Sequence, residues 1–189
     1  MPSQYFADEP KADISVAFRN PHALDTARHQ VLFALTDYLA GLSLDELSYQ
    51  ASIGGISFST APNNGLYVSA NGFTQRMPQL LTSLVEGYSS FTLTKERLAQ
   101  AKSWYREQLE VAEKGKAYEL AIQPAKLLSH VPYSERIERR KLLDSISVQD
   151  VVAYRDDLLK QSAVEVLAVG NMTAEQVISL AESLKKHSV

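Results

Sequence analysis

The chain has 189 residues, of which 45% are hydrophobic and 22% are charged, and its formal net charge is −3. This composition is ordinary for a globular protein, and the length suits a single core, so we expect residues 1–189 to form one domain. The acidic balance argues against nucleic acid and membranes as partners, and no stretch approaches the roughly 20 apolar residues that span a bilayer. The absence of cysteine excludes disulfides and thiolate metal sites.

The first predicted elements are a strand and a helix. Alternating apolar and polar residues predict a strand over residues 13–19, which Asn20-Pro21 ends. Beyond it, apolar residues recur at helical spacing from about Asp25 to Leu42. This stripe predicts an amphipathic helix.

Residues 44–73 carry the clearest pattern in the chain, a helix followed by a hairpin. Ser43 followed three residues later by Glu46 has the form of a capping box, which predicts the start of a second helix. Gly54-Gly55 ends that helix, because glycine accepts the left-handed conformation of a closing turn. Alternating runs on either side of Asn63-Asn64-Gly65 predict an antiparallel hairpin.

Helices dominate the second half of the chain. Capping residues and helical spacing predict helices over 74–88, 94–115, 117–128, from Ser134, over 147–160 and from Thr173. Pro124 predicts a break near Gln123, and Val164–Val169 reads as an apolar strand. The order β-α-α-β-β-α-α-α-α-β-α lacks regular βαβ alternation. It favours the α+β class, as a two-layer sandwich with a mostly antiparallel sheet packed against helices.

Three features of these helices allow more than one interpretation. The charge run over residues 135–141 could bind an acidic partner or nucleic acid, but positive charge is not sustained, and a solvated helix face is favoured. Trp104 lies beside an apolar stripe and could form an interface, although packing at the helix edge is favoured. Lys102, at the edge of the same stripe, is expected to extend its ammonium group to water.

Motifs for metal or nucleophilic chemistry are absent. In an HxxEH helix, two histidines four residues apart converge on zinc and the glutamate polarises the bound water. The four histidines here, His22, His29, His130 and His187, contain no pair at that spacing. No G-x-S-x-G elbow or glycine-rich phosphate loop occurs either. We therefore assign no catalytic residue, no metal ligand and no cofactor to this chain.

His22, Asp25 and His29 are the one metal candidate weighed in detail. On a continuous helix the two histidines would lie about 10 Å apart along the axis, too far to share an ion. Asp25 and His29 could supply two ligands, but nothing nearby completes a set. The segment is therefore interpreted as an exposed helix start, where the helix dipole favours an acidic residue.

Several short motifs, in order and spacing, resemble the family of pitrilysin and insulin-degrading enzyme, the metallopeptidases with an inverted zinc motif. They are Leu44, Leu47, Tyr49, Gly54-Gly55, Gly65, Leu66, Gly72 and Phe73, preceded by Tyr5–Asp13 and followed by Val169–Thr173. The resemblance covers essentially the whole chain. In a catalytic repeat of the family, HxxEH occupies the first long helix after the first strand, where this chain has Asp25–His29. The resemblance therefore implies the third, non-catalytic repeat of a bacterial pitrilysin-like protease.

This resemblance also implies a role. The parent would be a zinc metalloendopeptidase that degrades small polypeptides, with zinc in its N-terminal half, and this chain would be a structural, substrate-chamber domain of its C-terminal half. The expected partners are the N-terminal catalytic half, the adjacent repeats and peptide substrates. Substrate-contacting Arg and Tyr side chains of that half belong to the following repeat, so substrate-binding residues stay unknown here.

Two further expectations concern location and an alternative role. The resemblance implies a periplasmic parent whose signal would lie upstream, while composition alone leaves the cytoplasm open. The alternative is a stand-alone module that binds a peptide or a subunit, for example by strand addition to a sheet edge, which needs no signature residues.

Overall fold

The computed structural model describes residues 9–114 and 134–186. Its elements are β1 (Lys11–Arg19), α1 (Ala27–Ile53), β2 (Ile56–Pro62), β3 (Gly65–Phe73), the 3₁₀ helix η1 (Thr74–Arg76), α2 (Met77–Ser90), α3 (Lys95–Glu113), α5 (Arg136–Leu143), α6 (Val148–Lys160), β4 (Ala163–Gly170) and α7 (Ala174–Lys185). The predicted helix over 117–128, with its break at Pro124, lies outside the described residues.

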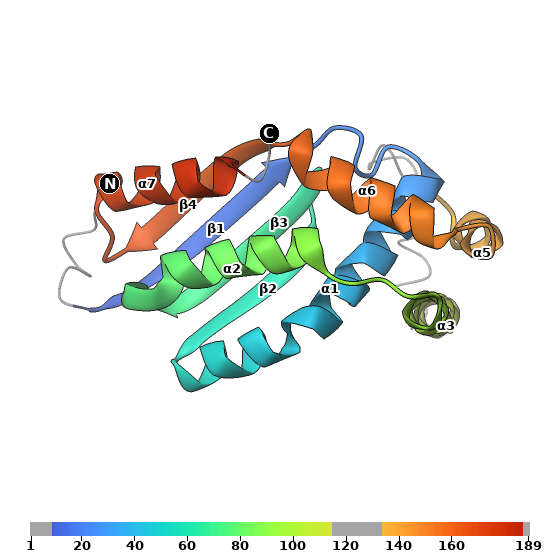
Figure 1. Cartoon of the computed structure of the whole chain (residues 1–189), viewed down its shortest axis with the longest axis horizontal. Helices are drawn as coiled ribbons and strands as arrows, with labels where there is room; N and C mark the ends of the chain where they lie inside the picture. Colours follow the sequence, from blue (N-terminus) through green and yellow to red (C-terminus); the bar gives the residue numbers. More distant parts are fainter. Residues whose placement is uncertain (1–8, 115–133, 187–189) are drawn as a thin grey trace.

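The strands form one antiparallel sheet in the order β2-β3-β1-β4. In Figure 1 the sheet is seen face-on, with α2, α6 and α7 in front of it and the opposite face left open. Val16 in the centre of β1 lies opposite Val68 of β3 and Val166 of β4. This arrangement confirms the predicted α+β two-layer sandwich.

The core lies between the sheet and the helices. Strand side chains alternate, so one set enters the core, where Ile14 and Phe18 are both 0% exposed. The helices contribute the other half through leucines such as Leu35 and Leu84, which are also 0% exposed. Burial of such side chains supplies about 1.5–3 kcal/mol each, which makes this layer the main source of stability.

Helix α1 is one continuous helix, so the predicted second start at Ser43 is wrong. The Ser43 hydroxyl donates a hydrogen bond to the Leu39 carbonyl, 3.3 Å away, one turn back in the same helix. A serine inside a helix uses its hydroxyl in this way rather than as a cap. The predicted end is confirmed, because the Gly54 N–H donates to the Gln50 carbonyl and Gly55 has φ +70°.

The predicted hairpin is also confirmed. Strands β2 and β3 pair in antiparallel register, with Ile56 opposite Gly72. The connecting turn uses the left-handed region at Asn64, with φ 49°, and a positive φ of 128° at Gly65. These residue types tolerate that backbone conformation, which is why the turn could be predicted.

Three helix starts in the second half follow their predicted caps, and one does not. The side chains of Thr94, Ser147 and Thr173 each accept a hydrogen bond from a backbone N–H of the first helical turn. Thr74 instead donates to the Pro10 carbonyl, and the chain first makes the 3₁₀ turn η1. Pro78 then occupies the first turn of α2, where its missing N–H costs nothing.

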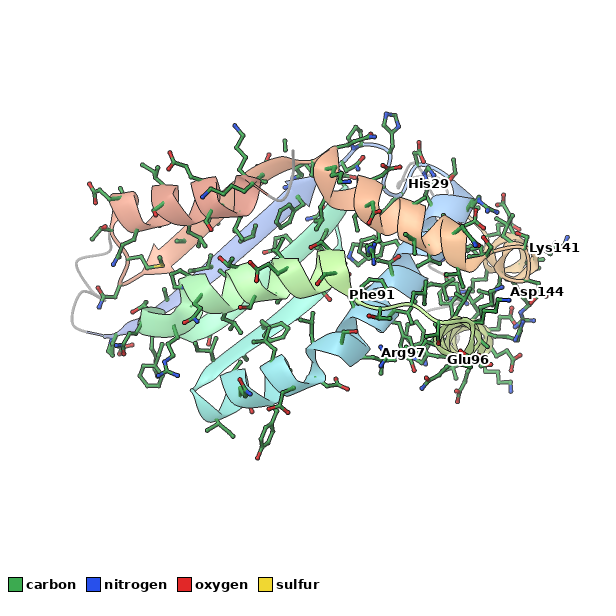
Figure 2. All side chains as sticks on the ribbon, viewed as in Figure 1. His29, Phe91, Glu96, Arg97, Lys141 and Asp144 are labelled. Carbon is green, nitrogen blue, oxygen red and sulfur yellow. The ribbon has the colours of Figure 1, made fainter. Side chains whose placement is uncertain are left out.

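Helices α3 and α5 are joined by charged groups, which corrects two expectations. Arg140 lies 3.2 Å from Glu113, so the charge run binds α3 instead of forming only a solvated face. The Lys102 ammonium donates to the Asp144 carbonyl at the end of α5, 3.2 Å away, rather than extending freely to water. Asp144 and Lys141 lie at that end of α5 in Figure 2. The sequence did not reveal that α5 packs beside α3.

Trp104 packs at a helix edge, as favoured from the sequence. Its ring stacks on Tyr38 of α1, with centroids 4.4 Å apart and planes 18° from parallel. The indole is partly buried against the core. No helix among the described residues is long and apolar enough to cross a membrane.

Candidate functional site

The start of α1 is the place where a catalytic repeat would carry the zinc motif. Thr26 is the N-cap, and its hydroxyl accepts a hydrogen bond from the His29 N–H, 3.1 Å away. The helix therefore begins at Ala27, two residues later than the predicted start at Asp25. His29 lies on the first turn, close to α6 (Figure 2).

Asp25 holds both neighbouring histidines. Its Oδ1 lies 2.6 Å from Nδ1 of His29, and its Oδ2 lies 3.1 Å from Nδ1 of His22. The predicted separation of the histidines along one helix is wrong, because His22 belongs to the turn before α1. Both carboxylate oxygens are occupied by imidazole nitrogens, so the arrangement is a hydrogen-bonded cluster.

The electrostatics of Asp25 fit that arrangement. Partial burial alone raises the pKa of Asp25, but hydrogen bonds from His22 and His29 and their positive charge together lower the pKa below its ordinary value. The carboxylate is thus held ionised as an acceptor. A general acid would need the opposite shift.

Tyr154 of α6 closes this cluster from the other side. Its ring centroid lies 5.8 Å from that of His29, and its hydroxyl donates to the Ala23 carbonyl at 2.6 Å. Burial, with a smaller contribution from the charge of Asp25, raises the pKa of Tyr154 far above its ordinary value. The phenol stays protonated, and we interpret it as a structural tie between α6 and the turn before α1.

A cavity of about 370 Å³ lies between α1 and α6 beside the cluster. Its charged lining is paired, since Arg28 lies 2.8 Å from Asp150. Asp150 also accepts from the backbone N–H and hydroxyl of Ser147, which completes the capping box of α6. No nucleophile and base face each other here.

Asp150 gives the fold a dependence on acid. Hydrogen bonds from the Ser147 backbone and hydroxyl, with a smaller effect of Arg28, lower the pKa of Asp150 below its ordinary value of 3.8. A lowered folded pKa stabilises the fold fully above the unfolded pKa, and this stability is lost as the pH falls through the folded value. We expect urea midpoints at pH 6 and pH 3 to differ less for Asp150→Asn than for the parent chain. An equal difference would contradict this role.

Among residues 9–114 and 134–186, no group of three or more His, Asp or Glu side chains is arranged to hold a metal ion. His130 and His187 lie outside these ranges. The empty spacing test in the sequence therefore agrees with the geometry of the described histidines.

The open face of the sheet is the second surface considered. Its polar side chains pair with one another across strands: the Tyr67 hydroxyl donates to Ser15 at 2.7 Å, and the Asn71 amide donates to Asp13. Arg19 lies 3.0 Å from Glu165 on the neighbouring strand. This face offers a polar, charge-balanced surface rather than a reaction centre.

A larger cavity of about 670 Å³ lies at the end of the sheet, between the end of α1 and the start of α2. Leu47, Ala51 and Leu80 give it an apolar side, and Gln50 and Arg76 are among its polar groups. It holds no histidine or acidic side chain. Hydrolytic chemistry has no general base there.

One buried polar cluster was missed from the sequence. Asp37 of α1 accepts hydrogen bonds at Oδ1 from Thr60 of β2, 2.7 Å away, and from Tyr88 of α2, 2.5 Å away. Tyr88 is 1% exposed. The available signal was a single acidic residue inside the apolar stripe of α1. The cluster ties three elements together and is structural.

These observations define a class: an α+β domain with helices on one face of an antiparallel sheet, and no assembled metal or nucleophile site among the described residues. Comparison with known proteins places it further. The domain described as "Middle or third domain of peptidase_M16" matches residues 1–141. The chain belongs to the M16 peptidase family, which confirms the resemblance carried by residues 44–73.

The relatives are much longer than this chain. It is 60% identical over 185 residues to Protease 3 of Escherichia coli (strain K12), which covers 98% of this chain and 19% of that protein. It is 24% identical over 177 residues to insulin-degrading enzyme of Homo sapiens, which covers 93% of this chain and 17% of that enzyme. The chain thus spans only 19% of the length of the first relative.

Solved structures agree on the fold. The crystal structure of pitrilysin matches with a TM-score of 0.95 and 58% identity, over 100% of this chain and 20% of that one. A peptidase M16 inactive domain from Pseudomonas fluorescens matches with a TM-score of 0.65 and 12% identity, over 95% of this chain and 46% of that one. The second match supports the fold alone.

Proposed function

We propose that residues 1–189 are one structural domain, without catalytic residues, of a longer zinc metalloendopeptidase that degrades small polypeptides. The observation that carries the proposal is the start of α1, where Asp25 binds His22 and His29 and the HxxEH residues are missing. High identity to Protease 3 over 98% of the chain supports the link to a peptidase. The name of the Pseudomonas fluorescens domain, which calls it inactive, is in keeping with this role.

The domain would act as part of a chamber wall. Its helices cover one face of the sheet, while the other face presents mutually paired polar side chains that leave little charge for a peptide to bind tightly. Zinc would be held by the N-terminal half of the longer protein. That half and the adjacent repeats would be the partners, peptides would be the substrates, and the periplasm would be the location.

The test is zinc content and peptide cleavage by the purified chain. We expect no stoichiometric zinc after dialysis against zinc, and no cleavage of a fluorogenic peptide that a chelator can stop, because the described histidines are occupied by Asp25. His29→Ala is the matched control, since it removes the histidine on α1. Zinc-dependent cleavage that His29→Ala abolishes would overturn the proposal.

A second candidate is a stand-alone module that binds a peptide or a subunit. The observation that favours it is the edge of β4, which pairs on one side only among the described residues. Mixing the chain with a separately expressed N-terminal half would distinguish the two. Tight association with recovered activity supports the chamber role, and peptide binding by this chain alone supports the module.

A further inference from the structure

Strand β4 has a free edge. The sheet order places β4 at one side, where β1 is its single partner among residues 9–114 and 134–186. Eight residues, Ala163–Gly170, therefore present one row of backbone groups away from the sheet. This inference goes beyond catalytic inactivity and does not depend on it.

The register identifies the outward groups. The Asn171 N–H donates to the Lys11 carbonyl, 2.9 Å away, so the residue opposite Lys11 turns its backbone groups toward β1. In an antiparallel pair this orientation alternates along the strand, so Leu167 also bonds toward β1. The N–H and C=O groups of the alternate residues, Val164, Val166 and Ala168, point outward.

The two edges of the sheet are treated differently. The β2 edge ends in Pro62, contacts α1, and is tied to it through the hydrogen bond from Thr60 to Asp37. Strand β4 reads AVEVLAVG, with no proline, no lysine and one charge, Glu165, which Arg19 binds at 3.0 Å. Edges are normally protected by charges, proline or a covering element. The β4 edge lacks the first two and is suited to accept a strand.

Both faces beside this edge leave apolar surface uncovered. On the open face, Leu167 is 64% exposed and Val169 is 50% exposed. On the helical face, Val164, Val166 and Ala168 are only partly buried against the core. A neighbouring strand would cover both sets, because side chains of adjacent strands lie about 5 Å apart.

Helix α7 determines what can fit. It contacts β4, and in Figure 1 it lies in front of this strand and extends beyond it, on the side away from β1. A single strand added to β4 would lie beneath α7. A second copy paired through its own β4 would bring its α7 into the same layer, where the two helices would collide. The space therefore suits a lone extended segment.

We propose that the free edge of β4 binds one extended peptide by strand addition. The peptide exchanges backbone hydrogen bonds with Val164, Val166 and Ala168, which requires no particular sequence. Its alternate side chains suit this environment when apolar residues lie under α7 and polar or basic residues lie on the open face near Glu165. This preference for extended, alternating peptides is the chemical class of the ligand.

The test uses the fluorescein-labelled peptide acetyl-Lys-Val-Thr-Val-Thr-Val-Lys-amide and the whole chain. We expect a Kd between about 1 µM and 1 mM by fluorescence anisotropy. Val166→Pro removes an outward N–H without touching the β1 ladder, so binding weakens by about tenfold or more. Val166→Thr keeps the N–H and is the matched control, with binding retained. A melting curve checks that both variants fold.

Two further measurements make the result decisive. Bound peptide is expected to slow hydrogen exchange at Val164, Val166 and Ala168, while Leu167, already bonded to β1, changes little. Peptides N-methylated on the valines or on the other residues block opposite edges, so one version loses binding and the other keeps it. Failure to bind, binding insensitive to both methylations, or a dimer that Val166→Pro dissolves would each overturn the proposal.

Discussion

Gly72→Val is expected to lower the free energy of unfolding by roughly 3–5 kcal/mol, the largest effect in the chain. Gly72 has φ +138°, which L side chains rarely adopt, and a Cβ there would overlap the Gly55 carbonyl oxygen and lie 2.8 Å from Ile56 Cα. Backbone on the neighbouring strand cannot move aside without breaking the β2–β3 ladder. The melting temperature should fall by about 10 °C.

Gly41→Ala is the matched control for that variant. Gly41 lies inside α1, and a Cβ there would meet nothing within 4 Å. Alanine is the better helix former, so we expect a stabilisation of about 0.5–1 kcal/mol. Thermal melts of both variants compare a glycine that the fold needs with one that it merely tolerates. An unchanged melting temperature for Gly72→Val would refute the strain argument.

Asp37→Ala is expected to cost about 1–3 kcal/mol of stability, because it leaves the buried Tyr88 hydroxyl without an acceptor. Tyr88 is 1% exposed, and burial, with the charge and hydrogen bond of Asp37, raises the pKa of its phenol well above the ordinary value. The hydroxyl therefore stays a donor at all accessible pH. Chemical denaturation of the variant and the parent measures the loss.

A double-mutant cycle separates this hydrogen bond from packing. In the Asp37→Ala background, Tyr88→Phe removes the stranded hydroxyl and should recover part of the lost stability. Asp37→Asn keeps an acceptor oxygen and should cost less than Asp37→Ala. Equal losses for Asp37→Asn and Asp37→Ala, with no recovery by Tyr88→Phe, would show that the cluster contributes little.

Local rules predicted most elements of this fold. The hairpin at Asn63-Asn64-Gly65, the helix end at Gly54-Gly55 and the cap at Thr173 each depend on residues within a few positions of one another. These are the cases in which residue type and backbone conformation are directly coupled. Ser43 failed the same kind of rule, because a capping box pattern inside a long apolar stripe is overruled by the core contacts of α1.

Tertiary contacts account for what the sequence did not reveal. Lys102 and Arg140 look like surface cations until α5 is known to lie against α3, and nothing local specifies that neighbour. Asp37 likewise finds Thr60 and Tyr88, which lie on two other elements. At the candidate site, the missing HxxEH pattern was visible in the sequence, whereas the sharing of Asp25 by His22 and His29 needed the turn before α1.

The position of β1 has a consequence for how the chain folds. Strand β1 is central, yet it pairs with β4, and Arg19 and Glu165 are 146 residues apart along the chain. Closing so long a loop slows folding compared with local helix formation. On the ribosome, at about 5–20 residues per second, β1 and the hairpin would wait many seconds for β4. A three-stranded intermediate with the β1 edge exposed is therefore the species that chaperones would meet.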